Sequence, residues 1–222
     1  MRSFFIAFFA LAACSNNNNG GGGNDSGTGS SDSGTMDEPM EDPDTGPPPC
    51  VYPAGPYGYV LGSTVSPGIS WQGYAPNDTT GTVTTLKMSD LYDCDGRFGI
   101  NAILLDEAAL WCGPCQQEAM ALPGYLSGGW DADGVKVASL VVQDLQQKPA
   151  TTANALTWRN QFKLNMIWVA ADPAWIFSHE GTNGLPMNVL IDPRTMKITK
   201  ILEGFGGQDP AVDALAKKNK TN

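Results

Sequence analysis

The chain has 222 residues, which fits one domain of ordinary size with attached segments and is long enough to bury a core of its own. Its formal net charge of -10 argues against non-specific binding to nucleic acids. The acidity is uneven, because residues 15–49 hold seven acidic and no basic residues, whereas residues 50–222 hold 16 acidic and 12 basic residues. The charge of the expected folded part therefore says little about its partners.

The first 14 residues have the pattern of an export signal. Arg2 precedes an apolar run, Phe4–Ala13, which is shorter than the roughly 20 residues of a membrane-spanning helix but fits the apolar core of a secretory signal. The run ends in Leu-Ala-Ala-Cys, which resembles the bacterial lipobox, whose cysteine is lipidated and begins the mature protein. We therefore expect residues 1–13 to be a lipoprotein signal peptide and Cys14 to carry the lipid. A plain cleaved signal with an incidental cysteine is the alternative.

Residues 14–49 have the composition of a tether. After Cys14 they contain no aromatic residue, valine, isoleucine or leucine, and they are rich in Gly, Asn, Ser, Asp and Pro. Such a segment cannot bury enough apolar surface to offset the entropy of ordering, so we expect a disordered acidic linker. With the lipobox resemblance, this implies a lipid-anchored protein of the bacterial cell envelope, periplasmic or associated with the outer membrane.

Residues 50–80 are rich in proline, glycine and aromatic residues, which predicts an extended, irregular N-terminal extension lying against a globular domain at 81–222. A short strand is expected at Thr82–Leu86 and a turn at Ser89–Asp95. The cysteine count is five, and lipidation of one leaves an even number. Cys50 and Cys94 are a possible structural disulfide, because leftover cysteines usually pair in an oxidising compartment. Two buried free thiols or a second redox-active pair are the alternatives.

From residue 100 onward, strand and helix patterns alternate. Strands are expected at Ile100–Ala109, Val135–Val142, Met166–Ala170, Met187–Ile191 and Lys197–Leu202, the last two forming an antiparallel hairpin. Helices are expected at Gly113–Leu126, Thr151–Phe162, Asp172–Ser178 and Asp209–Lys218. In the first, Pro123-Gly124 would form a kink or a stop. In the second, Ala153, Leu156 and Phe162 would face inward. This alternation predicts an α/β fold in which helices cover both faces of a mixed central sheet.

The segment Trp-Cys-Gly-Pro-Cys at 111–115 lies between an expected strand and an expected helix. That placement puts Cys112 at a helix N-terminus, where unpaired backbone N–H groups and the helix dipole favour a thiolate. We expect Cys112 to be exposed and to attack, and Cys115, one turn deeper, to resolve the mixed disulfide. No zinc-ligand spacing accompanies the pair, so no metal site is expected, and the lone His179 is interpreted as a surface residue.

This arrangement resembles the thioredoxin-like superfamily, and in particular bacterial lipoproteins of the membrane-anchored TlpA-like thiol-disulfide oxidoreductases, which carry a redoxin domain. The resemblance covers roughly residues 80–220. Asp106, six residues before Cys112, matches the buried aspartate thought to relay protons to the second cysteine; burial would raise its pKa. Leu185-Pro186 matches the cis-proline that faces the cysteine pair and leaves a backbone edge for a substrate peptide.

The resemblance implies an extracytoplasmic, membrane-tethered thiol-disulfide oxidoreductase of the protein-disulfide reductase type. It would act on protein thiols and disulfides, with the Cys112–Cys115 disulfide as its redox centre and no other cofactor. The reducing direction is favoured because a Gly-Pro interior is typical of reducing thioredoxins. An upstream membrane electron donor, a monomeric state and no nucleic-acid partner are expected. The catalytic residues would be Cys112, Cys115, Asp106 and Pro186, supported by Trp111, Gly113, Pro114 and Leu185.

Two alternatives remain, and three residues depart from the family pattern. A peroxiredoxin-like peroxidase would resemble a pattern with threonine three residues before the reactive cysteine, where this chain has Ala109. A redox-inert binding lipoprotein on a thioredoxin scaffold would not need both cysteines. Glu107 and Ala108 replace an aromatic pair, and Leu185 replaces a β-branched residue. We interpret Glu107 as lying on a partly solvated face; the alternative is that its carboxyl group perturbs a nearby thiol.

Overall fold

The computed structural model describes residues 50–177, 184–206 and 209–221. The expected signal peptide, Cys14, the linker and His179 lie outside these residues. Within them, no helix combines the length and the hydropathy needed to cross a membrane.

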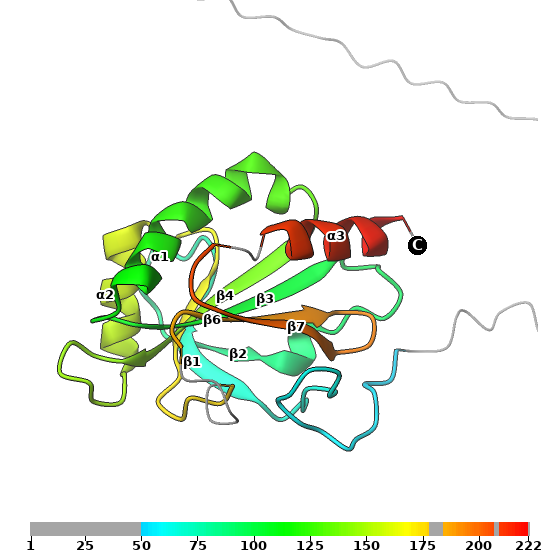
Figure 1. Cartoon of the computed structure of the whole chain (residues 1–222), viewed down its shortest axis with the longest axis horizontal. Helices are drawn as coiled ribbons and strands as arrows, with labels where there is room; N and C mark the ends of the chain where they lie inside the picture. Colours follow the sequence, from blue (N-terminus) through cyan, green and yellow to red (C-terminus); the bar gives the residue numbers. More distant parts are fainter. Residues whose placement is uncertain (1–49, 178–183, 207–208, 222) are drawn as a thin grey trace, which may run out of the picture. The chain divides into compact units, whose positions relative to one another are not determined.

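Seven strands form one mixed sheet in the order β2-β1-β5-β4-β3-β6-β7 (Figure 1). The central strand β3 pairs in parallel with β4 and antiparallel with β6. β4 and β5 are parallel, whereas β1 pairs antiparallel with both β2 and β5, and β6 with β7. The strands are β1 (Ser70–Tyr74), β2 (Thr84–Lys87), β3 (Ala102–Ala109), β4 (Val135–Gln143), β5 (Trp168–Ala171), β6 (Met187–Asp192) and β7 (Lys197–Glu203).

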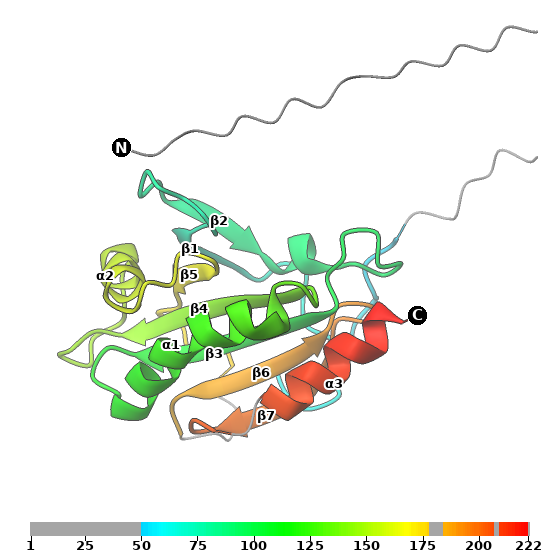
Figure 2. The same ribbon diagram turned by 90° about the horizontal axis from the view of Figure 1, so that it is seen from above.

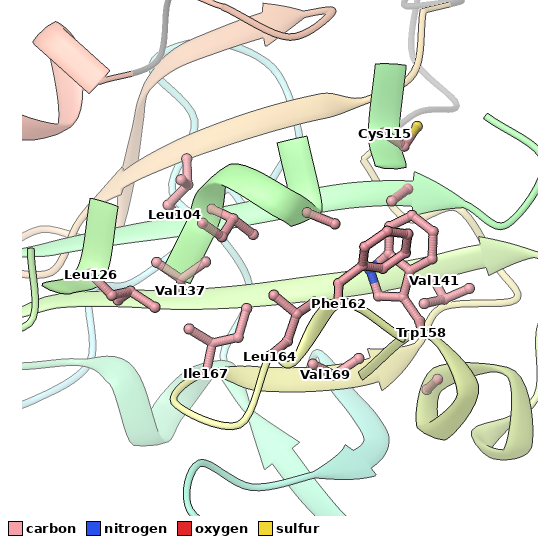
Figure 3. Packing of buried hydrophobic residues seen from close by; sticks show 14 of the residues in the cluster. Leu104, Cys115, Leu126, Val137, Val141, Trp158, Phe162, Leu164, Ile167 and Val169 are labelled. Carbon is pink, nitrogen blue, oxygen red and sulfur yellow. The ribbon is translucent and has the colours of Figure 1, made fainter. Parts of the chain in front are cut away.

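The α-helices lie over one face of this sheet. They are α1 (Gly113–Tyr125), α2 (Thr152–Phe162) and α3 (Asp209–Lys220), and Figure 2 shows α1 and α3 on the same side of the strands. Side chains from all three meet the strands in one buried cluster, part of which is seen in Figure 3. Because side chains alternate along a strand, Leu104 of β3 faces these helices while Leu105 faces the opposite side.

The opposite face is covered by residues that precede the central strands and by the short 3-10 helix η1 (Met88–Leu91). Val65 and Ile69 are buried there, and Trp71 contributes from β1. The extension therefore does more than lie on the surface, because residues 70–74 form a strand of the sheet itself. A disulfide joins Cys50 to Cys94, with Cα atoms 5.8 Å apart, and confirms the expected structural pair.

Helices on both faces were expected, and in the described residues all three α-helices contribute to the same cluster. The reason lies after β5, where Asp172–Phe177 forms turns instead of the expected helix. The Asp172 carboxylate accepts hydrogen bonds from the N–H groups of Ala174 and Ile176, and Trp175 has a positive φ of 53°. Both features favour a turn over a continuing helix.

Two further expectations about the helices are corrected. Pro123 lies inside α1, and the chain winds on into a π-helical turn, η2 (Leu126–Trp130), because Leu122 and Leu126 are both buried in the core. In α2, Thr151 caps the N-terminus, and of the residues expected to face inward, Ala153 is exposed and Leu156 is half-buried. The buried face of α2 consists of Ala155, Trp158, Arg159 and Phe162.

Candidate active site

The cysteine pair lies where β3 passes into α1. Cys112 is the N-cap of the helix, and its Sγ accepts a hydrogen bond of 3.1 Å from the backbone N–H of Cys115. Pro114 occupies the first turn of α1. Backbone N–H groups in that turn have no intrahelical acceptor, so the N–H that proline lacks costs no hydrogen bond. The two sulfurs form a disulfide, with Cα atoms 5.3 Å apart. The structure is therefore that of the oxidised chain.

Cys112 is less accessible than expected, whereas Cys115 lies deeper, as expected. Cys112 is 4% exposed and Cys115 is fully buried, so the expectation that Cys112 is exposed is wrong, although it is the more accessible of the two. The cause is the apolar cluster that contains both sulfurs, against which Trp175 and Leu185 also pack. Trp111 forms the exposed rim, at 43% exposure, and its indole N–H donates to Gln143.

Asp106 lies fully buried on the helix-covered face of β3. Burial raises its pKa to about 7, opposed in part by a hydrogen bond of 2.9 Å that the Ser139 hydroxyl donates to Oδ2. The indole N–H of Trp158 in turn donates to Ser139, which fixes the direction of the hydroxyl. The raised pKa confirms the expectation for this residue and gives it a proton to exchange near neutral pH.

A second acid, Glu118, lies fully buried on α1, three residues after Cys115 and thus on the same side of the helix. The side-chain amide of Asn188 donates to Glu118 at 3.2 Å, and Asn188 is the register partner of Asp106 across β6 and β3. Asn188 therefore links the two buried acids: it is the register partner of Asp106 and the hydrogen-bond donor to Glu118. Sequence reasoning missed Glu118, Ser139 and Asn188; the spacing of Glu118 from Cys115 was the one signal that could have found a member of this group.

The Leu185–Pro186 peptide bond is cis, as the resemblance implied. Pro186 immediately precedes β6, whose ladder with β3 begins with the pair Glu107 and Met187. Its carbonyl accepts a hydrogen bond from Gly204 N–H at the far end of β7. This register places Pro186 beside the end of β3, and Leu185 contacts the cluster that holds both cysteines.

Glu107 contradicts the expectation of a partly solvated face. It is fully buried, and its Oε1 accepts a hydrogen bond of 2.9 Å from the backbone N–H of Phe177. The extension and the turns after β5 cover this face, which the pattern of β3 alone could not indicate.

Among the described residues, one group of potential metal ligands lies close together, Cys50, Cys94 and Asp95, but the disulfide between the two cysteines removes their thiolates.

No family model matches the sequence, and no curated protein matches it. Solved structures do resemble the fold. A candidate thiol:disulfide interchange protein, DsbE, from Chlorobium tepidum is 23% identical with a TM-score of 0.50, covering 74% of this chain and 100% of its own. The reduced 2-Cys peroxiredoxin of Plasmodium vivax is 15% identical with a TM-score of 0.51, covering 73% and 84%.

An uncharacterized conserved protein from Geobacillus kaustophilus is 15% identical with a TM-score of 0.50, covering 74% of this chain and 86% of its own. At such identities the likeness speaks for the arrangement of strands and helices and for nothing finer. It agrees with the mixed sheet and the helices that pack on it. The chain therefore has the thioredoxin-like fold that its sequence predicts.

Proposed function

We propose that the protein is a thiol-disulfide oxidoreductase that reduces disulfide bonds of other proteins through Cys112 and Cys115. The observation that carries this proposal is the site itself: a disulfide-bonded pair at the N-terminus of α1, above a buried carboxyl group with a pKa of about 7. A pair held only for stability would not need an acid poised near neutral pH beneath it.

The reaction begins with the reduced pair. The Cys112 thiolate attacks one sulfur of the substrate disulfide, forming a mixed disulfide and releasing the other substrate sulfur as a thiolate that takes up a proton. The Cys115 thiolate then attacks Cys112 Sγ, forming the intramolecular disulfide and releasing the second substrate thiol. Two electrons and two protons pass to the substrate, and an external dithiol donor must restore the reduced pair.

Asp106 serves the second attack. Cys115 is fully buried, so water has little access to its thiol proton. A neighbouring carboxylate with a pKa near 7 can take that proton at neutral pH and return it later. Glu118 is the second buried carboxyl group in this region and offers an alternative site for the proton.

The charges around the pair favour the reducing direction. Asp106 and Glu118 are buried on β3 and α1, the two elements that flank the cysteine motif, and α1 contains neither lysine nor arginine. Nearby negative charge opposes the thiolate form of the reduced pair, whereas oxidants of this kind stabilise it. The Gly-Pro interior of the motif agrees with this direction by its resemblance to reducing thioredoxins.

We place the protein outside the cytoplasm, tethered by lipid on Cys14 and supplied with electrons by a membrane donor. The lipobox resemblance and the composition of residues 14–49 support this location. A structural disulfide between Cys50 and Cys94 also fits an oxidising compartment. Protein substrates would lie as extended segments beside Leu185 and Pro186.

The test is the reduction of insulin disulfides by the purified protein with dithiothreitol as the donor. We expect catalysis that Cys112→Ser abolishes. Turnover of hydrogen peroxide in place of insulin would support the peroxidase alternative, which Ala109 disfavours because a buried methyl group cannot donate a hydrogen bond to the attacking sulfur. Activity on neither substrate would support a binding role.

A further inference from the structure

Glu107 is a fully buried acid that the proposed chemistry does not use. It follows Asp106 in β3, so its side chain projects from the other face of the sheet. Its neighbours on that face, Leu105 and Met187, are apolar and fully buried. Burying a carboxyl group is costly unless it makes hydrogen bonds, so its presence in this strand calls for a specific role.

The Glu107 side chain holds the end of the turns that follow β5. Its Oε1 accepts the backbone N–H of Phe177 at 2.9 Å, and Phe177 is itself only 2% exposed. The Phe177 ring meets Tyr59 edge-on, with centroids 5.7 Å apart, and lies 6.4 Å from the Trp71 ring. Strand β3 therefore fixes the backbone of Phe177, while the extension and β1 fix its ring.

The same residue holds the start of β6. Glu107 and Met187 are register partners in the antiparallel ladder between β3 and β6, and Met187 directly follows Pro186. Glu107 thus holds the β5–β6 connection at two points: at Phe177, within it, through its side chain, and at Met187, where β6 begins, through its backbone. The Leu185–Pro186 edge belongs to this connection.

The turns that precede Phe177 pack against the same buried cluster as the cysteine pair. Asp172 accepts hydrogen bonds from Ala174 N–H at 3.3 Å and Ile176 N–H at 3.0 Å, which fixes their first half. Trp175, between those two amides, packs against the cluster that contains Cys112 and Cys115. Leu185 contacts that cluster and also the cluster on the face of Glu107.

We propose that Glu107 is a positioning residue for protein substrates: by anchoring Phe177 it sets Trp175 and the Leu185–Pro186 edge against the cysteine pair. This inference rests on the proposed function. It also gives the extension a part in positioning the substrate. Tyr59 packs against the ring of Phe177, the residue whose backbone N–H binds Glu107. The anchor should matter for a substrate that contacts this edge and not for a small disulfide that needs only the sulfur.

The test compares two substitutions with a matched control. Glu107→Met is close in size but accepts no strong hydrogen bond, whereas Glu107→Gln keeps an acceptor oxygen. Leu105→Ala is the control, because Leu105 is fully buried on the same strand and face but lies two residues from the anchor. KM and kcat are measured for insulin and for hydroxyethyl disulfide, and the exchange of the Phe177 and Met187 amides is followed by NMR.

Glu107→Met should raise KM for insulin by about tenfold, the size of one lost hydrogen bond, and leave kcat/KM for hydroxyethyl disulfide unchanged. Glu107→Met should also accelerate hydrogen exchange of the Phe177 amide. Glu107→Gln should keep both the KM for insulin and this exchange rate close to those of the wild type. An unchanged KM in Glu107→Met, or an equal rise in Leu105→Ala, would overturn the inference. If the wild-type protein reduces no insulin, the proposed function fails; amide exchange then still decides whether Glu107 is the anchor, since unchanged exchange at Phe177 would exclude it.

Discussion

At the scale of single residues, the alternation of one strand separates two acids that are neighbours in sequence. Asp106 faces α1 and the cysteines, where burial raises its pKa to about 7, and Glu107 faces the extension, where it binds Phe177 N–H. The sequence predicted the first role through the spacing of Asp106 from Cys112. It could not predict the second, because the partner of Glu107 lies 70 residues away in a segment that the pattern assigned to a helix.

The raised pKa of Asp106 predicts a pH-dependent stability. Between its ordinary pKa of 3.8 and about 7, the folded protein retains a proton that the unfolded chain loses, so stability falls as pH rises through this range. The Asp106→Asn variant has no carboxyl group at this position and should not lose stability in this way as the pH rises. Its melting temperature should therefore exceed that of the wild type by an amount that grows from pH 4 to pH 8. The exposed Asp90→Asn variant serves as the control and should show no such trend.

The same substitution should slow turnover. Without the Asp106 carboxylate, the buried Cys115 thiol has lost one of its proton acceptors, and a loss of roughly tenfold to a hundredfold in kcat for insulin reduction is expected near pH 7. The measurement is made on folded protein, verified by its melting curve. An unchanged kcat would show that Asp106 is part of the core and takes no part in the proton transfer.

The two cysteines should differ in reactivity. In the reduced protein, iodoacetamide should modify Cys112 faster than Cys115, because Cys112 is the more accessible and sits at the end of α1. Cys112→Ser should abolish disulfide exchange, whereas Cys115→Ser should accumulate mixed disulfides that non-reducing gels reveal. Equal or reversed alkylation rates would remove Cys112 from its role as the attacking residue.

At the scale of elements, the alternating pattern predicted the order of strands and helices from β3 to α3, including the hairpin of β6 and β7. It did not predict which face each element covers. The turns at Asp172–Phe177 replace an expected helix because a side-chain carboxylate takes two backbone N–H groups and Trp175 has a positive φ. Pro123 does not end α1 because buried leucines on both sides keep the chain on the core.

The disulfide of the extension should act on stability alone. Cys50 and Cys94 are 44 residues apart in sequence, and closing a loop of that size restricts the unfolded chain by about 3–4 kcal/mol in the chain-entropy model. Replacing both with serine should lower the free energy of unfolding in urea by about that amount. Insulin reduction by the variant should be unchanged below its unfolding transition. Loss of activity with full stability would instead indicate a second redox centre.

At the scale of the whole molecule, one arginine connects segments that are far apart in the sequence. Arg194 donates to the carbonyl oxygens of Asp93, Ile100 and Asn219, and it pairs with the buried Asp93 carboxylate at 3.3 Å. The turn before β7 is thereby joined to the segment before β3 and to α3. The sequence showed Arg194 only as part of a turn, because its partners Asp93 and Ile100 lie 101 and 94 residues away.

Removing this arginine should be costly. Arg194→Met leaves the fully buried Asp93 carboxylate without its cation and frees three carbonyl oxygens, so the free energy of unfolding should fall by about 3–5 kcal/mol. Urea unfolding measures the loss, and Arg97→Met, which breaks an exposed ion pair, is the control with a much smaller expected loss. Equal losses would show that Arg194 does not have this connecting role.

The central claim is that Cys112 and Cys115 form a reducing dithiol, and their reduction potential tests it most directly. The disulfide can be equilibrated with dithiothreitol buffers and followed through the fluorescence of the adjacent Trp111. The two buried acids and the Gly-Pro interior predict a potential near that of thioredoxin, about -270 mV. A potential near about -120 mV, the range of strong oxidants, would contradict the account.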